Sequence, residues 1–123
     1  CDFARVDDRI IGLKANIGYA MELNNKAETL TFGNHLFKYN LDKGTREDHF
    51  LGSHTVGGEP LFAPNPNSKD EKDGYVMSIV HDNERNKSKL IIIDTDDFSN
   101  KPVAEILLPQ RVPFGAHGSW LEN

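Results

Sequence analysis

The feature of this sequence that most constrains its fold is a pair of hydrophobic strand patterns joined by a polar turn. Residues 74–82 and 89–94 are rich in aliphatic and β-branched side chains, and residues 83–88 between them are polar. This arrangement predicts an antiparallel hairpin with a long loop. Both faces of residues 75–80 are largely apolar, which is typical of a sheet that is covered on both sides. We therefore expect this hairpin to lie between neighbouring layers.

Similar short patterns surround the hairpin, and no amphipathic helix longer than two turns is evident. The further predicted strands are residues 18–23, 29–32, 35–39, 46–50, 58–63 and 102–108. They suggest two consecutive meanders of about four strands, at a spacing of about 40–50 residues that fits the blades of a β-propeller. A β-sandwich would give the same local patterns. The fold class is thus all-β, and a propeller is favoured because a final segment runs past the second meander toward a central axis.

Composition and charge exclude several classes of protein. The chain has 123 residues and a formal net charge of -5, and its scattered Lys and Arg residues offer no surface for nucleic acid. No apolar stretch approaches the roughly 18 residues of a membrane span. The single cysteine suits a reducing compartment. The chain begins with Cys1, and its main motif lies close to the last residue, so we expect the C-terminal piece of a longer protein.

That motif contains one histidine, His117, in a segment of small residues. The small neighbours are Gly115, Ala116 and Gly118. They leave room for a ligand or a metal ion close to the backbone, and Phe114 and Trp120 are candidates for a wall that keeps water out. The alternative is a histidine that is satisfied within a tight bend after a strand.

Two carboxylates are candidate partners for such a histidine. Glu59 lies between two glycines and a proline at the start of a predicted strand, and a buried glutamate there would need a cation or an imidazole N–H as partner. An exposed Glu59 is the alternative. Asp2, beside an aromatic residue, is a further candidate.

The four other histidines show no spacing typical of a self-contained metal site. We expect His35 and His81 at the surface or at sheet edges, and His49 and His54 in solvent. A complete metal site is therefore not predicted within this chain.

Several ordered motifs resemble those of the C-terminal part of the carotenoid cleavage oxygenases, which include lignostilbene dioxygenases and the retinoid isomerase of the retinal pigment epithelium. The matching segments are residues 2–7, 18–19, 58–64, 73–78, 90–94, 102–105 and 111–118. The resemblance covers nearly the whole chain. It implies about the last two blades of a seven-bladed β-propeller: residues 1–56 as one blade, 57–109 as the next, and 110–123 as an axial strand that carries a metal ligand.

The resemblance also implies a site. Family members hold a non-haem iron(II) with four histidines, of which His117 would be the last, and their glutamates accept hydrogen bonds from these histidines. Glu59 matches one such glutamate, and Asp2 stands where another is usual, so its shorter side chain departs from the pattern. Ala116 often corresponds to Phe, which implies a differently shaped pocket beside the iron. Phe114, Ala116 and Trp120 are the candidate pocket walls, and no catalytic residue beyond the metal site is implied.

The implied reaction is the oxidative cleavage, by dioxygen, of one carbon–carbon double bond in an apolar conjugated molecule such as a carotenoid, an apocarotenoid or a stilbene. A cytoplasmic location with peripheral membrane contact is expected of the full-length protein, and no partner protein is evident. The alternative is a non-catalytic β-propeller that serves as a binding scaffold. The two hypotheses differ in whether the intact protein holds iron.

Overall fold

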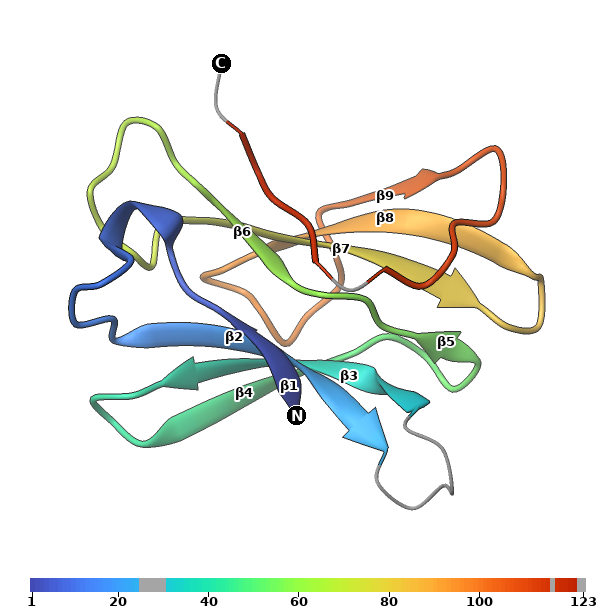
Figure 1. The fold of residues 1–123 in the computed structure, drawn as a ribbon, viewed down its shortest axis with the longest axis horizontal. Helices are drawn as coiled ribbons and strands as arrows, with labels where there is room; N and C mark the ends of the chain where they lie inside the picture. The colour runs from blue at the N-terminus through green and yellow to red at the C-terminus, as the bar shows by residue number, and fades with distance from the viewer. Residues whose placement is uncertain (25–30, 116, 122–123) are drawn as a thin grey trace.

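The computed structural model describes residues 1–24, 31–115 and 117–121, which form two antiparallel sheets and a single three-residue 3-10 helix, Asp8–Ile10. The first sheet has the order β1-β2-β3-β4. Its strands are β1 (Asp2–Arg5), β2 (Ile17–Asn24), β3 (Thr31–Asn40) and β4 (Thr45–Phe50). Each strand pairs with its neighbour in the sequence, so the sheet is a meander, as predicted, but its first strand β1 was not among the predicted strands (Figure 1).

The second sheet has the order β5-β7-β8-β9, and β6 also pairs with β7. Its strands are β5 (Thr55–Val56), β6 (Leu61–Pro64), β7 (Gly74–Asp82), β8 (Lys87–Asp94) and β9 (Ala104–Leu107). The predicted hairpin of residues 74–94 is confirmed as β7 and β8, with Tyr75 opposite Asp94 and Asp82 opposite Lys87. The all-β class is therefore confirmed.

Two details differ from the sequence-based expectation. Residues 29–32 and 35–39 were expected as two strands, but residues 31–40 form the single strand β3; Thr29 and Leu30 lie outside the described residues. The second sheet begins at Thr55, two residues before the expected division at residue 57, because Thr55 and Val56 pair with the end of β7.

The expected axial strand at residues 110–123 is also corrected: its described residues form no strand. Two of its backbone N–H groups donate to side chains instead of a neighbouring strand, Val112 to the Ser88 hydroxyl at 2.9 Å and Gly118 to the Glu59 carboxylate at 2.6 Å. Pro113 has no N–H to donate. The segment therefore crosses the second sheet as an extended chain held by side chains (Figure 1).

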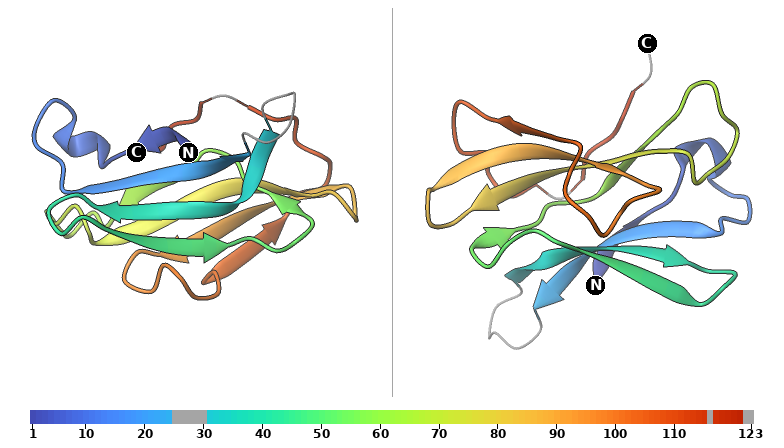
Figure 2. Two further views of the ribbon diagram at one scale, coloured as in Figure 1. Left: turned by 90° about the horizontal axis from the view of Figure 1, so that it is seen from below. Right: turned by 180° about the vertical axis from the view of Figure 1, so that it is seen from behind.

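The core lies between the two sheets, which form two layers (Figure 2). It is built from side chains of both sheets and of the loop after β8: Ile17, Tyr19, Met21, Leu36, Phe62, Val76, Val80, Ile91, Ile93 and Phe98. Along β7, Val76 and Val80 are buried in this core, and Tyr75 and Ile79 are exposed on the opposite face. His81 and Ser88 at the other end of that face are buried beneath Val112 and Phe114, so among the described residues the outer face of the hairpin is covered only in part. No helix in the described ranges has the length and hydropathy to cross a membrane.

Candidate functional site

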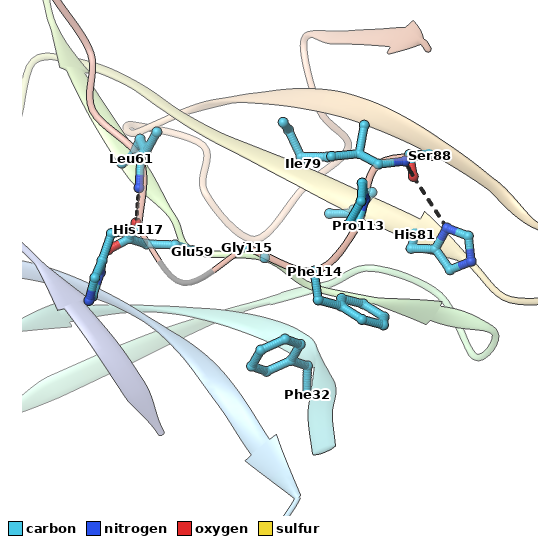
Figure 3. Close-up of a pocket in the computed structure, with 14 residues that line it drawn as sticks. Phe32, Glu59, Leu61, Ile79, His81, Ser88, Pro113, Phe114, Gly115 and His117 are labelled. Atoms are coloured by element: carbon cyan, nitrogen blue, oxygen red, sulfur yellow. Dashed lines mark hydrogen bonds and ion pairs between the residues drawn. The ribbon is translucent and has the colours of Figure 1, made fainter. Parts of the chain in front are cut away.

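The structure brings Glu59 and His117 together in one site. The Glu59 side chain is 6% exposed, and its Oε1 lies 3.1 Å from Nδ1 of His117. Its other carboxylate oxygen accepts the Gly118 N–H. An ionised carboxylate only accepts hydrogen bonds, so the neutral His117 tautomer that fits this contact carries its proton on Nδ1 and its lone pair on Nε2. The His117 side chain is 73% exposed, so that nitrogen is accessible (Figure 3).

The position of Glu59 follows from an irregular segment between β5 and β6. Both strands pair with β7, and residues 57–60 lie opposite residues 78–80, so this side holds one residue more than its partner. Such a bulge redirects a side chain out of the alternation of the sheet. Gly58 fits this bend because a Cβ there would lie 2.5 Å from the Ile79 carbonyl oxygen. Its N–H donates to the Ser78 hydroxyl at 3.3 Å, which in turn donates to the Gly58 carbonyl at 3.0 Å.

Two residues of β1 complete the surroundings of this pair, and the sequence analysis did not single out either of them. Phe3 packs against the His117 ring, with ring centroids 5.5 Å apart. Its φ of 55° is unusual for a residue with a side chain and coincides with an irregularity in the pairing of β1 with β2. Arg5 places a guanidinium nitrogen 3.7 Å from Oε1 of Glu59. The only signal in the sequence was their place in the motif of residues 2–7.

Asp2, the other predicted carboxylate, is exposed. Its Oδ1 accepts a hydrogen bond from the N–H of Phe3 at 2.7 Å. Asp2 lies where the pairing of β1 with β2 is irregular. Glu59 lies between β5 and β6, where the pairing with β7 is irregular. Both carboxylates are therefore found at breaks in strand pairing. Of the two, Glu59 is the one placed at His117 within the described ranges.

A cavity of about 150 Å³ adjoins the pair. Glu59 and His117 lie on one side of it, and His81 and Ser88 lie on the other (Figure 3). The wall between them is aromatic: Phe32 contacts Phe114 at 5.4 Å between centroids, and Phe114 contacts His81 at 6.1 Å. Phe3 packs behind this wall, against Phe32 at 5.9 Å.

The three predicted wall residues have different outcomes. Phe114 lines the cavity. Trp120 is about half exposed and is not among the lining residues, and Ala116 lies outside the described residues. Gly115 also lines the cavity, and a Cβ added there would meet no atom within 4 Å, which leaves the room beside the backbone that the sequence suggested.

The other histidines correct part of the sequence analysis. His54 is exposed as predicted. His49 was expected in solvent, but it is buried against the loop after β8, where its Nδ1 lies 2.8 Å from the Phe98 carbonyl oxygen. This burial lowers the pKa of His49. His81 is likewise buried, with Nδ1 3.3 Å from the Ser88 hydroxyl, whereas His35 is partly exposed and contacts Glu22 at 3.0 Å.

Within the described part of the chain, no group of three or more His, Cys, Asp and Glu side chains could hold a metal ion. The site therefore consists of one accessible imidazole, oriented by a buried carboxylate, beside an apolar cavity. Metal-bound histidines commonly donate their second N–H to a carboxylate in this way.

Comparisons with known proteins show the family of this chain. A family model described as "Retinal pigment epithelial membrane protein" matches residues 1–122. The chain is 30% identical to apocarotenoid-15,15'-oxygenase of Synechocystis sp. over 72% of this chain and 18% of the relative. It is 37% identical to resveratrol cleavage oxygenase 1 of Aspergillus fumigatus, over 73% of this chain and 18% of the relative.

Solved structures are similar over the whole chain. A lignostilbene dioxygenase of Pseudomonas brassicacearum superposes with a TM-score of 0.91 at 29% identity, over 100% of this chain and 27% of that structure. A cobalt-substituted apocarotenoid oxygenase of Synechocystis superposes with a TM-score of 0.89 at 25% identity, over 100% of this chain and 26% of that structure. The chain thus spans about a quarter of these structures.

Proposed function

The chain belongs to the retinal pigment epithelial membrane protein family, the carotenoid cleavage oxygenases, and from this premise we propose that it is part of an iron(II)-dependent dioxygenase. The enzyme cleaves one carbon–carbon double bond of a carotenoid, an apocarotenoid or a stilbene. In the balanced reaction, the carbon–carbon double bond and the O–O bond break, and two carbonyl bonds form. Both oxygen atoms of one dioxygen molecule enter the products.

The observation that carries this proposal is the hydrogen bond between Glu59 and His117. It fixes the proton on Nδ1 and leaves Nε2, the nitrogen that a metal needs, accessible. The residues therefore fit an iron(II) ion, of which His117 would be one ligand. An iron(II) bound by neutral imidazoles keeps its charge and supplies an open position for dioxygen. The further ligands are proposed to come from the rest of the protein.

The remaining residues of the site bind and orient. Glu59 keeps the His117 ring in one orientation, and its contact with the Gly118 N–H ties the backbone of the extended segment to the same carboxylate. The aromatic rings of Phe32 and Phe114 in the cavity wall suit a flat, conjugated, apolar substrate. The relatives named as apocarotenoid, resveratrol and lignostilbene oxygenases support this class of substrate.

We propose that the two sheets are adjacent blades of a seven-bladed propeller, divided near residue 56, and that residues 110–123 carry His117 toward its axis. The exposed apolar face of β7, with Tyr75 and Ile79, is then covered by the next blade. Asp2 would take the place of a family glutamate toward another ligand histidine. Because carotenoids reside in membranes, we also propose a cytoplasmic protein with peripheral membrane contact.

The test is the iron content of the whole protein. His117→Ala should lose most of its bound iron together with its cleavage activity, because one ligand is removed. His54→Ala, which changes an exposed histidine outside the cavity of Figure 3, is the matched control and should keep both. Equal iron content in the two variants would contradict the ligand role of His117 and would favour a non-catalytic binding scaffold.

A further inference from the structure

Arg5 forms an ion pair with the buried carboxylate of Glu59. Its Nη1 lies 3.7 Å from Oε1 of Glu59, the same oxygen that faces His117. The Arg5 side chain is only 23% exposed. A charge pair that is mostly shielded from water is screened less than a pair at the surface, so Arg5 acts on Glu59 more strongly than an exposed residue would.

The guanidinium is itself held from two sides. Its Nη2 lies 3.3 Å from Oδ2 of Asp8, in the 3-10 helix after β1. The backbone of Arg5 pairs with Tyr19 of β2, so the side chain starts from a fixed strand. The planar guanidinium thus reaches two carboxylates with two different nitrogens, which the single ammonium group of a lysine cannot reproduce.

We propose that Arg5 is a positioning residue of this site. Its guanidinium holds the Glu59 carboxylate in the orientation in which one oxygen faces the His117 imidazole and the other accepts the Gly118 N–H. Through this contact, β1 of the first sheet fixes the geometry of a side chain that belongs to the second sheet and, through it, of His117. The effect on metal retention rests on the proposed function, whereas the orientation of Glu59 does not.

The first experiment measures hydrogen exchange at the Gly118 amide in the metal-free whole protein, at single-residue resolution. In Arg5→Gln the carboxylate loses its anchor, and we expect the Gly118 amide to exchange about fivefold faster, the equivalent of one weakened hydrogen bond. Arg5→Lys keeps the charge and should restore part of the protection. Arg85→Gln removes an exposed arginine that is paired with Asp82, and its Gly118 amide should exchange at the wild-type rate.

Asp8→Asn separates positioning from a general role in folding. It removes the charge of the second partner of Arg5 but leaves the pair with Glu59, so the Gly118 amide should exchange more slowly than in Arg5→Gln. Unchanged Gly118 exchange in Arg5→Gln would overturn the proposal. So would equal acceleration in Asp8→Asn and Arg5→Gln, because the effect would then reflect the local fold of residues 5–8. If Arg5→Gln does not fold, Arg5→Lys decides: a Gly118 rate equal to that of the wild type overturns the proposal, and an intermediate rate supports it.

The second experiment loads the same variants with cobalt(II) and records metal content and the visible absorption bands of the bound ion. Arg5→Gln should retain about tenfold less cobalt, which is the lower end of the loss of metal affinity seen when a residue that supports a metal ligand is replaced. Its absorption bands should also shift, because the histidine is no longer correctly oriented. Wild-type protein that takes up no cobalt would contradict the proposed function, and the exchange experiment would still decide the role of Arg5.

Discussion

Glu59 and His117 lie 58 residues apart in the sequence, and their side chains are joined by a hydrogen bond of 3.1 Å. Glu59 belongs to the irregular segment before β6, and His117 belongs to an extended segment after the last strand. The bulge turns the carboxylate toward that segment, and the Gly118 N–H closes a second contact on the same group. The orientation of the histidine is therefore set by the pairing of β5 and β6 with β7.

Replacing Glu59 with Gln should weaken metal retention in the whole protein. The amide keeps the shape of the side chain but removes the charge that orients His117 and pairs with Arg5. We expect iron affinity to fall by about 10-fold to 100-fold. Metal titration checks this. Glu105→Gln is the control, because Glu105 is an exposed glutamate of β9, outside the site, that pairs with Lys89. Wild-type affinity in Glu59→Gln would remove the carboxylate from the site.

Replacing Gly58 with Ala should disturb the same site through the backbone. The new methyl group would lie 2.5 Å from the Ile79 carbonyl oxygen, so the bulge must shift, and Glu59 with it. We expect a loss of about 2 kcal/mol in the free energy of unfolding, as for other overpacked sites, and a lower iron content. Gly115→Ala is the control, since nothing lies within 4 Å of the added methyl group. Denaturation that is identical in the two variants would contradict this account.

Replacing Phe114 with Ala should affect the substrate more than the metal. Its ring contacts Phe32 and His81 in the cavity wall, so truncation opens the pocket without touching Glu59. We expect the KM for a conjugated substrate to rise about fivefold, the equivalent of one aromatic contact, at unchanged iron content. Trp120→Ala removes an aromatic side chain that does not line the cavity and should leave KM unchanged. Iron loss in Phe114→Ala would show that the ring supports the metal site instead.

His49 should make stability depend on pH. Burial lowers the pKa of its imidazole, so below the usual value of about 6.5 the unfolded chain binds a proton that the folded chain resists. The free energy of unfolding should therefore fall as the pH drops from about 7.5 to about 5.5. Urea denaturation at both pH values tests this. His49→Gln should show a flatter dependence, and His54→Gln should behave as the wild type; equal slopes in all three would disprove it.

Local pattern predicted the strands well where alternation was strong. Residues 74–82 and 89–94 are rich in the aliphatic and β-branched side chains that favour strands, so β7 and β8 could be predicted from the sequence alone. The resemblance implied an axial strand after residue 109. That expectation was wrong because its N–H groups found the Ser88 hydroxyl and the Glu59 carboxylate, partners that lie far away in the sequence.

Burial of the histidines shows the same limit. His49 lies in a polar stretch of β4, and its neighbours along the chain predict exposure. It is buried because the loop that contains Phe98 covers it, a contact across 49 residues. Likewise Arg5 and Phe3 reach the site because β1 lies beside β2, which no local pattern in residues 2–7 reveals.

The sequence by itself determined the all-β class and the succession of strands. It also determined the few candidate residues of a metal site, with His117 and Glu59 among them. These follow from side-chain period and from residue chemistry, which are local properties. Only the tertiary structure decided that Glu59 and not Asp2 faces His117, that Arg5 stands beside this pair, and that Phe32 of the first sheet meets Phe114 of the extended segment in the cavity wall. The reason is physical: a hydrogen bond of about 3 Å requires the bulge at Glu59 and the extended segment at His117 to be packed together, and that packing depends on the whole core.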